Sequence, residues 1–194
     1  EFMRKYPNIE IELSNHDQVI DLLEHQTDVA IRFGELNDST LHAKLLCRSR
    51  LYIVSSPEYL ARYGEPKTLA DLAGHRLVHY VSTLGGRSSG FEYVDSESAN
   101  RVVSVQMPGA LTVNNSVAYL SACLSGLGVI QTPEVGLKPY FESGQLVEIL
   151  PDFRAEPMPV WLIYSNRRHL PRRVQAFMNW FEQLMKERLS TGRT

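Results

Sequence analysis

The sequence has few cysteines and no long apolar run. Its 194 residues include 2 cysteines, Cys47 and Cys123. So few thiols exclude a disulfide-stapled scaffold, and we expect a cytoplasmic protein with both cysteines free, one Cys47–Cys123 disulfide being the alternative. No apolar stretch approaches the ~20 residues that span a bilayer. We therefore expect no membrane partner.

Net charge is also nearly absent. Lys and Arg together number 20, against 22 Asp and Glu, and the formal net charge is -2. DNA-binding domains need a basic face to neutralise phosphates, so we expect this chain not to bind DNA well by itself. The hydrophobic share of 43% is that of an ordinary globular protein, and a chain of this length needs neither metal nor disulfide to fold.

Patterns that carry catalysis are missing as well. The segment GGRSSG, residues 85–90, lacks the lysine and spacing of a phosphate-binding loop, and no Gly-x-Ser-x-Gly elbow occurs. His75 and His79 would stand more than ~12 Å apart on a strand, too far to share a metal. We expect no catalytic residue, no metal and no cofactor, and thus a protein that is not an enzyme.

The first fifty residues predict a strand, a helix and a strand. Residues 1–7 read as the last turn of a helix stopped by Pro7, so we expect further elements upstream. Residues 9–13, IEIEL, alternate as a strand does, Asn15 can cap a helix, and residues 28–34 form a buried strand. This order predicts a βαβ unit with a parallel sheet.

The next fifty residues predict a change of lobe. Residues 41–56 are too long for one ordinary strand and shift their apolar phase near residues 48–50, which predicts a strand that crosses between lobes. Ser56 and Pro57 then open a helix that ends at Gly64, and Thr68 with Asp71 has capping-box spacing. Strands are expected at residues 75–80, 91–95 and 101–106.

A second βαβα unit is predicted at residues 111–133. It comprises a strand at 111–113, a helix bearing Val117, Leu120 and Leu124, a strand at 129–131, and a helix opened by Thr132 and Pro133. Strands at 145–150 and 159–165 and a helix from Pro171 follow. Two mainly parallel sheets flanked by helices and joined by two crossover strands predict a two-lobed α/β fold, with a ligand cleft at the carboxyl ends of strands.

Four segments, in order, resemble LysR-type transcription regulators. The segment DVAIRFGELNDSTLHAKLL, residues 28–46, matches the Asp-x-Ala-Ile-Arg-x-Gly strand and crossover of their sensing domain. Residues 4–13, 111–135 and 160–181 match in register with it. The resemblance covers nearly the whole chain.

This resemblance implies an effector-sensing domain with a periplasmic-binding-protein-like fold. Its first lobe would comprise residues 1–51 plus 163–194, and its second lobe residues 52–162. An N-terminal winged helix-turn-helix, absent from this chain, would bind promoter DNA, and the full-length protein would form dimers or tetramers. The alternatives are an extracytoplasmic solute-binding protein and an enzyme on the same fold, which would need an acid/base pair or a cofactor in the cleft.

Candidate ligand contacts lie where strands end and helices begin, because free backbone N–H groups favour an anion there. The resemblance places effector contacts at the same turns. A small polar or anionic metabolite is the expected ligand. Some candidates could instead serve the fold alone: Asn15, Ser116 and Thr132 as helix caps, Arg32 as a salt-bridge partner, Tyr80 as core. The candidates are Asn15, His16, Arg32, Gly34, Tyr80, Ser82, Asn114, Asn115, Ser116, Gln131 and Thr132.

Overall fold

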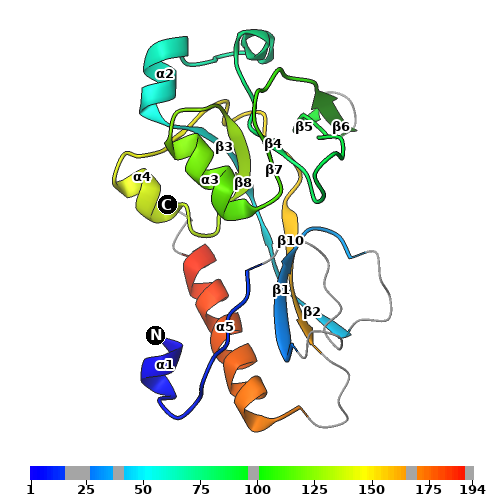
Figure 1. Ribbon diagram of the computed structural model, residues 1–194, viewed down its shortest axis with the longest axis vertical. Helices are drawn as coiled ribbons and strands as arrows, with labels where there is room; N and C mark the ends of the chain where they lie inside the picture. The colour runs from blue at the N-terminus through cyan, green and yellow to red at the C-terminus, as the bar shows by residue number, and fades with distance from the viewer. Residues whose placement is uncertain (16–26, 37–41, 96–100, 165–169, 191–194) are drawn as a thin grey trace. The chain divides into compact units, whose positions relative to one another are not determined.

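The computed structural model describes residues 1–15, 27–36, 42–95, 101–164 and 170–190 (Figure 1). The chain divides into two compact units, one formed by Glu1–Ser49 with Met158–Thr194 and the other by Arg50–Pro157. The sequence analysis predicts lobe boundaries after residues 51 and 162. Among the described residues, no helix is long and apolar enough to cross a membrane.

The first unit contains a three-stranded antiparallel sheet. Its order is β1 (Val29–Phe33), β10 (Met158–Tyr164) and β2 (His42–Ser49), with β10 in the middle. The predicted parallel pairing is therefore wrong for these strands. Residues 9–13 form no strand, because an alternating segment becomes one only where another strand offers hydrogen bonds, and no described strand pairs with it. The helix predicted from Asn15 lies outside the described residues.

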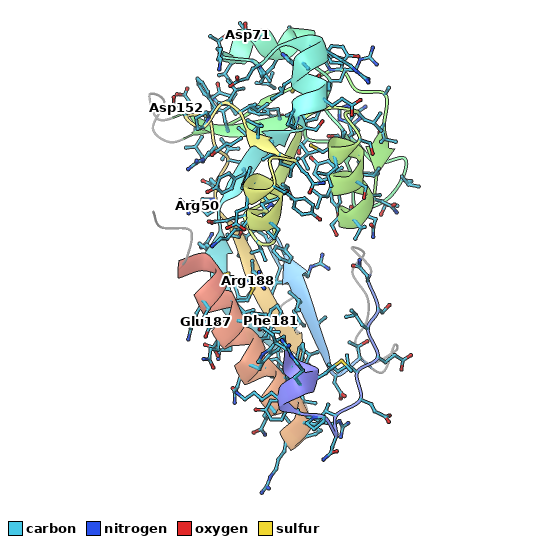
Figure 2. The ribbon with its side chains drawn as sticks, turned by 90° about the vertical axis from the view of Figure 1, so that its left-hand side faces the viewer. Arg50, Asp71, Asp152, Phe181, Glu187 and Arg188 are labelled. Carbon is cyan, nitrogen blue, oxygen red and sulfur yellow. The ribbon has the colours of Figure 1, made fainter. Side chains whose placement is uncertain are left out.

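Two helices complete the described part of this unit. The helix α1 (Phe2–Lys5) ends before Pro7, as predicted, and lies beside α5 (Arg172–Ser190) in both views (Figures 1 and 2). Phe2 is buried, with its ring 5.3 Å from that of Phe177 and 5.2 Å from that of Trp180. Phe181, labelled in Figure 2, stacks on Phe177 at 5.9 Å. Aromatic packing thus holds α1 to α5.

The second unit begins with the strand β3 (Leu51–Ser55), which pairs antiparallel with β8 (Ile130–Pro133) and β9 (Val147–Glu148). Because β2 ends at Ser49 and β3 starts at Leu51, the strand breaks where the apolar phase of the sequence shifts, near residues 48–50. Along β3, Ile53 belongs to one buried cluster and Val54 to another. Successive side chains of a strand point to opposite faces, so β3 separates two cores.

The short helices after β3 follow their predicted caps. In α2 (Pro57–Tyr63), the Ser56 hydroxyl accepts a hydrogen bond from the Tyr59 N–H at 3.3 Å. In the 3-10 helix η1 (Leu69–Gly74), the Asp71 carboxylate accepts bonds from the backbone N–H groups of Lys67 and Thr68. These bonds lower the pKa of Asp71, which Figure 2 labels on η1.

A parallel segment follows. Residues 77–81, which include β4 (His79–Tyr80), run parallel both to β7 (Thr112–Val113) and to Val129. The Val78 N–H donates a hydrogen bond to Val129 O at 3.0 Å, and the Val81 N–H donates one to Val113 O at 2.9 Å. The expectation of parallel pairing is met in this segment, although the larger sheet of the unit is antiparallel. The remaining elements are the hairpin β5 (Phe91–Asp95) and β6 (Arg101–Val105), and the helices α3 (Ser116–Leu124) and α4 (Lys138–Glu142).

One predicted helix start is wrong. Thr132 and Pro133 do not open a helix but extend β8, opposite Tyr52 and Leu51. The reason is tertiary: β3 offers a pairing partner, and a proline is tolerated at a strand end, where its missing N–H costs nothing. The next helix, α4, starts only at Lys138.

Candidate functional site

The parallel segment brings all seven second-unit candidates to one place. Because residues 77–81, 111–113 and 129–131 run in the same direction, their carboxyl ends meet at one edge. We call this set the carboxyl edge. It comprises Tyr80, Ser82, Asn114, Asn115, Ser116, Gln131 and Thr132.

Two members of the carboxyl edge serve the fold. The Asn115 side-chain oxygen accepts hydrogen bonds from Val117 N at 3.0 Å and Ala118 N at 3.1 Å, so it caps α3. The Gln131 amide pairs with the backbone of Glu92, donating to its carbonyl at 2.6 Å and accepting from its N–H at 2.8 Å. It therefore joins β8 to the β5–β6 hairpin as a strand would.

A tyrosine that sequence reasoning missed connects these elements. Tyr119 of α3 contacts Tyr80 edge-on at 5.5 Å, and its hydroxyl accepts a hydrogen bond from Gln131 N at 3.1 Å. Burial raises the pKa of Tyr119 to about 12, so the hydroxyl stays protonated. Tyr80 is half-buried, which fits its alternative assignment to the core. A tyrosine at helical spacing among apolar residues gives no signal that could have shown this role.

Three members keep hydrogen-bonding capacity. The Asn114 and Thr132 side chains are half-buried and Ser82 is exposed, and none of these side chains makes a hydrogen bond to a residue that the structure describes. Ser116 is exposed at the first position of α3 and has an interaction of its own. Asn114 and Thr132 are thus the carboxyl-edge groups best able to contact a ligand.

The first-unit candidates are less complete. His16 lies outside the described residues, and Asn15 is exposed in irregular backbone. Arg32 lies within β1 opposite Trp161, and its guanidinium pairs with no described residue. Gly34 has φ +97, its N–H donates to Pro159 O at 2.9 Å, and its carbonyl accepts from the Trp161 indole at 3.1 Å. Its polar groups therefore serve the fold.

An ion pair at the start of the second unit was not predicted. Arg50, labelled in Figure 2, donates two hydrogen bonds to Glu134, at 3.1 and 3.0 Å, and this carboxylate raises the pKa of the guanidinium. Arg154 lies over the Tyr52 ring at 4.9 Å and bonds to Glu148. These arginines have fixed partners and are not free to bind a ligand.

Neither thiol is disposed to react, and both are free. Burial raises the pKa of Cys123 to about 12, and burial also raises the pKa of Cys47. Thiolate is the reactive form, so high pKa values disfavour reaction at either sulfur. In the described ranges, no three His, Cys, Asp or Glu side chains gather as a metal site would require.

Known proteins resemble this chain over almost its full length. The family profile described as the LysR substrate binding domain matches residues 1–186. The HTH-type transcriptional regulator YhjC of Escherichia coli K12 is 42% identical over 97% of the chain and 62% of its own length. The HTH-type transcriptional repressor PA14_22550 of Pseudomonas aeruginosa is 33% identical over 96% of the chain and 58% of its own length.

Solved structures also resemble this chain. The regulatory domain of CrgA, a LysR-type regulator from Neisseria meningitidis, has a TM-score of 0.79 and 26% identity, over 94% of this chain and 87% of that one. Full-length AphB, a virulence activator from Vibrio cholerae, has a TM-score of 0.73 and 29% identity, over 94% of this chain and 60% of that one.

These relatives are transcription regulators. They support the regulator prediction over the solute-binding alternative, and they confirm that the chain is not an enzyme. The chain spans about 60% of the length of these curated relatives. With a family match from residue 1 to residue 186 and a mixed α/β fold shared with LysR regulatory domains, this chain belongs to the LysR substrate binding domain family.

Proposed function

We propose that this chain is the effector-sensing part of a LysR-type transcription regulator and binds a small polar or anionic metabolite. The whole protein would carry an N-terminal helix-turn-helix that contacts promoter DNA, as the names and lengths of the HTH-type relatives suggest. It would act in the cytoplasm, where promoter DNA lies, as a dimer or tetramer. The chain described here would supply the ligand response.

One observation carries the proposal: the half-buried Asn114 amide beside the first turn of α3 has no hydrogen-bond partner among the described residues. A side-chain amide offers two donors and an acceptor, and leaving them unpaired as burial increases costs free energy. A polar ligand at the carboxyl edge would satisfy them. The Thr132 hydroxyl is likewise half-buried and makes no hydrogen bond to a described residue.

Charge favours an anion at this edge. The amino end of α3 carries the positive end of the helix dipole, although Asn115 already accepts from two of its N–H groups. The first-unit candidates Asn15, His16, Arg32 and Gly34 stay predictions from the sequence and the family resemblance. Of these, Arg32 is the residue that would neutralise a carboxylate.

Regulation then requires differential binding. An effector changes the activity of a regulator only by as much as its affinity differs between the two states of the protein. Asn114 and Thr132 contribute to this difference if their bonds to the effector form in one state alone. Their individual contributions are measurable as losses of affinity.

The test starts with a thermal-shift screen of a metabolite library on the 194-residue chain. A ligand at 100 times its dissociation constant should stabilise the fold by about 2.7 kcal/mol. Calorimetric titration of the strongest stabiliser should then show binding weakened about tenfold or more by Asn114→Ala and by Thr132→Val, which corresponds to about 1.4 kcal/mol each.

Asn115→Ala is the matched control. It removes the neighbouring amide, but because that amide caps α3, it should lower the free energy of unfolding by about 0.5–2 kcal/mol and leave affinity largely unchanged. If a broad screen finds no stabiliser, or if the stabiliser binds both site variants as tightly as the parent chain, the carboxyl edge is not the effector site.

A further inference from the structure

A polar hollow lies within the second unit, apart from the residues of the carboxyl edge. It has a volume of about 430 Å³, within the usual range of small-ligand pockets. Its lining includes His79, Arg87, Ser88, Gln106, Met107 and Thr112, and none of these belongs to the carboxyl edge. His79 and Thr112 are paired neighbours on β4 and β7, and the other four come from the loop after β4 and the end of β6.

The loop that carries Arg87 is folded back on itself and tied to β6. Gly86 N donates to Thr83 O at 3.0 Å, and Gly90 N donates to the Ser88 hydroxyl at 3.2 Å. The Ser104 hydroxyl and the Gln106 amide both donate to Ser89 O, the latter at 3.1 Å. Arg87 is therefore presented from a supported loop, which reduces the ordering cost of binding.

Two glycines allow the backbone to lie close against residues that line the hollow. At Gly90, with φ +86, a Cβ would stand 2.6 Å from Val105 O and 3.0 Å from the Gln106 amide nitrogen. At Gly109 it would stand 2.6 Å from His79 Nε2. Only glycine permits these approaches, which hold the loop against β6 and the imidazole against the backbone.

The lining has unused donors and no carboxylate. The Arg87 guanidinium, the His79 imidazole and the Thr112 hydroxyl form no hydrogen bond or ion pair with the described part of the chain. His79 Nδ1 is buried without a partner among the described residues. The Ser88 hydroxyl accepts one bond and keeps its proton to donate. The Gln106 amide nitrogen donates to Ser89 O and to the Ser104 hydroxyl, and its side-chain oxygen accepts from no described residue. Met107 adds an apolar surface.

We propose that this hollow is a second ligand site, separate from the carboxyl edge, that takes a small organic monocarboxylate bearing hydroxyl groups. The single guanidinium matches one carboxylate. The hydroxyl, amide and imidazole groups match the ligand's own hydroxyls. The proposal does not depend on the effector site, because no carboxyl-edge residue lines the hollow.

The probe is gluconate, with sorbitol as its uncharged counterpart of equal carbon number. In a two-dimensional amide NMR titration of the 194-residue chain at constant ionic strength, gluconate should shift the signals of residues 86–88 and 106–107 saturably. The expected dissociation constant is on the order of 1 mM. Sorbitol should produce no saturable shift.

Variants separate this site from the carboxyl edge and from a general effect of charge. Arg87→Ala should weaken gluconate binding more than tenfold, and Thr112→Val should weaken it measurably. Arg62→Ala removes the same charge from an exposed position of α2 in the same unit and should bind like the parent chain. Asn114→Ala should also bind normally, because Asn114 belongs to the carboxyl edge. Each variant's amide spectrum reports whether it is folded.

Three results would overturn the proposal. These are the absence of a saturable shift with gluconate, unchanged binding by Arg87→Ala, or equal loss of binding in Asn114→Ala. The last result would show that the hollow and the carboxyl edge are one site, and it would leave the effector proposal standing.

Discussion

Adjacent side chains of the same type have different roles here. Asn114 and Asn115 are chemically identical neighbours, yet Asn115 caps α3 with two hydrogen bonds while Asn114 has no partner among the described residues. The capping alternative applies to Asn115, which the sequence did not single out for it. It does not apply to Thr132, which lies in a strand. Burial and hydrogen-bond geometry, rather than residue type, distinguish the asparagine that caps the helix from the one proposed to bind a ligand.

The buried histidine of the second unit makes stability sensitive to acid. His75 is 4% exposed beside Tyr59, and its Nδ1 has no hydrogen-bond partner among the described residues. Desolvation lowers its pKa from the ordinary 6.5, against a smaller opposing effect of Asp71. The unfolded chain therefore binds this proton more readily. The part of the free energy of unfolding that depends on neutral His75 is fully present above pH 6.5. It is lost as pH falls from there through the lowered pKa of His75 in the folded state.

We therefore expect the free energy of unfolding of His75→Asn to decrease less than that of the parent chain when the pH falls below 6.5. Urea unfolding on both sides of that pH, compared between variant and parent, measures the difference. His42→Asn is the matched substitution on the exposed part of β2 and should retain the acid sensitivity of the parent chain. Equal acid sensitivity in His75→Asn and the parent would show that this histidine does not contribute.

Among the elements, the parallel segment of the second unit depends on close backbone approach. A Cβ at Gly128 would stand 2.5 Å from Arg76 O, and one at Gly109 would stand 2.1 Å from Leu77 O. These glycines flank the segment on its two sides and permit the pairing that aligns the carboxyl ends of its strands. The carboxyl edge exists because this pairing is tight.

Gly109→Ala should destabilise the chain by about 1–3 kcal/mol, as overpacking does, because its methyl group would push against a carbonyl and against His79. Denaturant unfolding measures the loss. Gly74→Ala is the control, since a Cβ there meets nothing within 4 Å and the residue does not have positive φ. Similar stability of the two variants would mean that the backbone near Gly109 relaxes at little cost.

For the whole molecule, net charge bears on the proposed division between ligand sensing and DNA binding. With a formal net charge of -2, the chain lacks the overall excess of basic residues that releases counterions from DNA. The 194-residue chain should therefore fail to retard operator DNA in a gel at about 0.15 M salt. A protein of the full length of the HTH-type relatives, with the proposed N-terminal helix-turn-helix domain, is the positive control. Sequence-specific retardation by the chain alone at this salt concentration would refute the assignment of DNA binding to that domain.

Local patterns were sufficient for much of the order of elements and for several caps. The serine and proline that open α2, the reciprocal Thr68–Asp71 bonds and the helical spacing of apolar residues along α5 act between near neighbours, so they are readable from the chain itself. The phase shift near residues 48–50 and the family resemblance were equally visible. So was the set of polar residues at the ends of strands.

Pairing between distant strands was not readable in this way. β1 joined β10 antiparallel, residues 9–13 found no described partner, and Thr132 extended β8 instead of starting a helix. Strand partners are chosen by hydrogen bonds and packing between residues far apart in sequence, where alternation alone leaves direction and partner open. The same long-range contacts engaged Gln131, left the Asn114 and Thr132 side chains without a hydrogen-bond partner among the described residues, and assembled the Arg87 hollow from four separate segments.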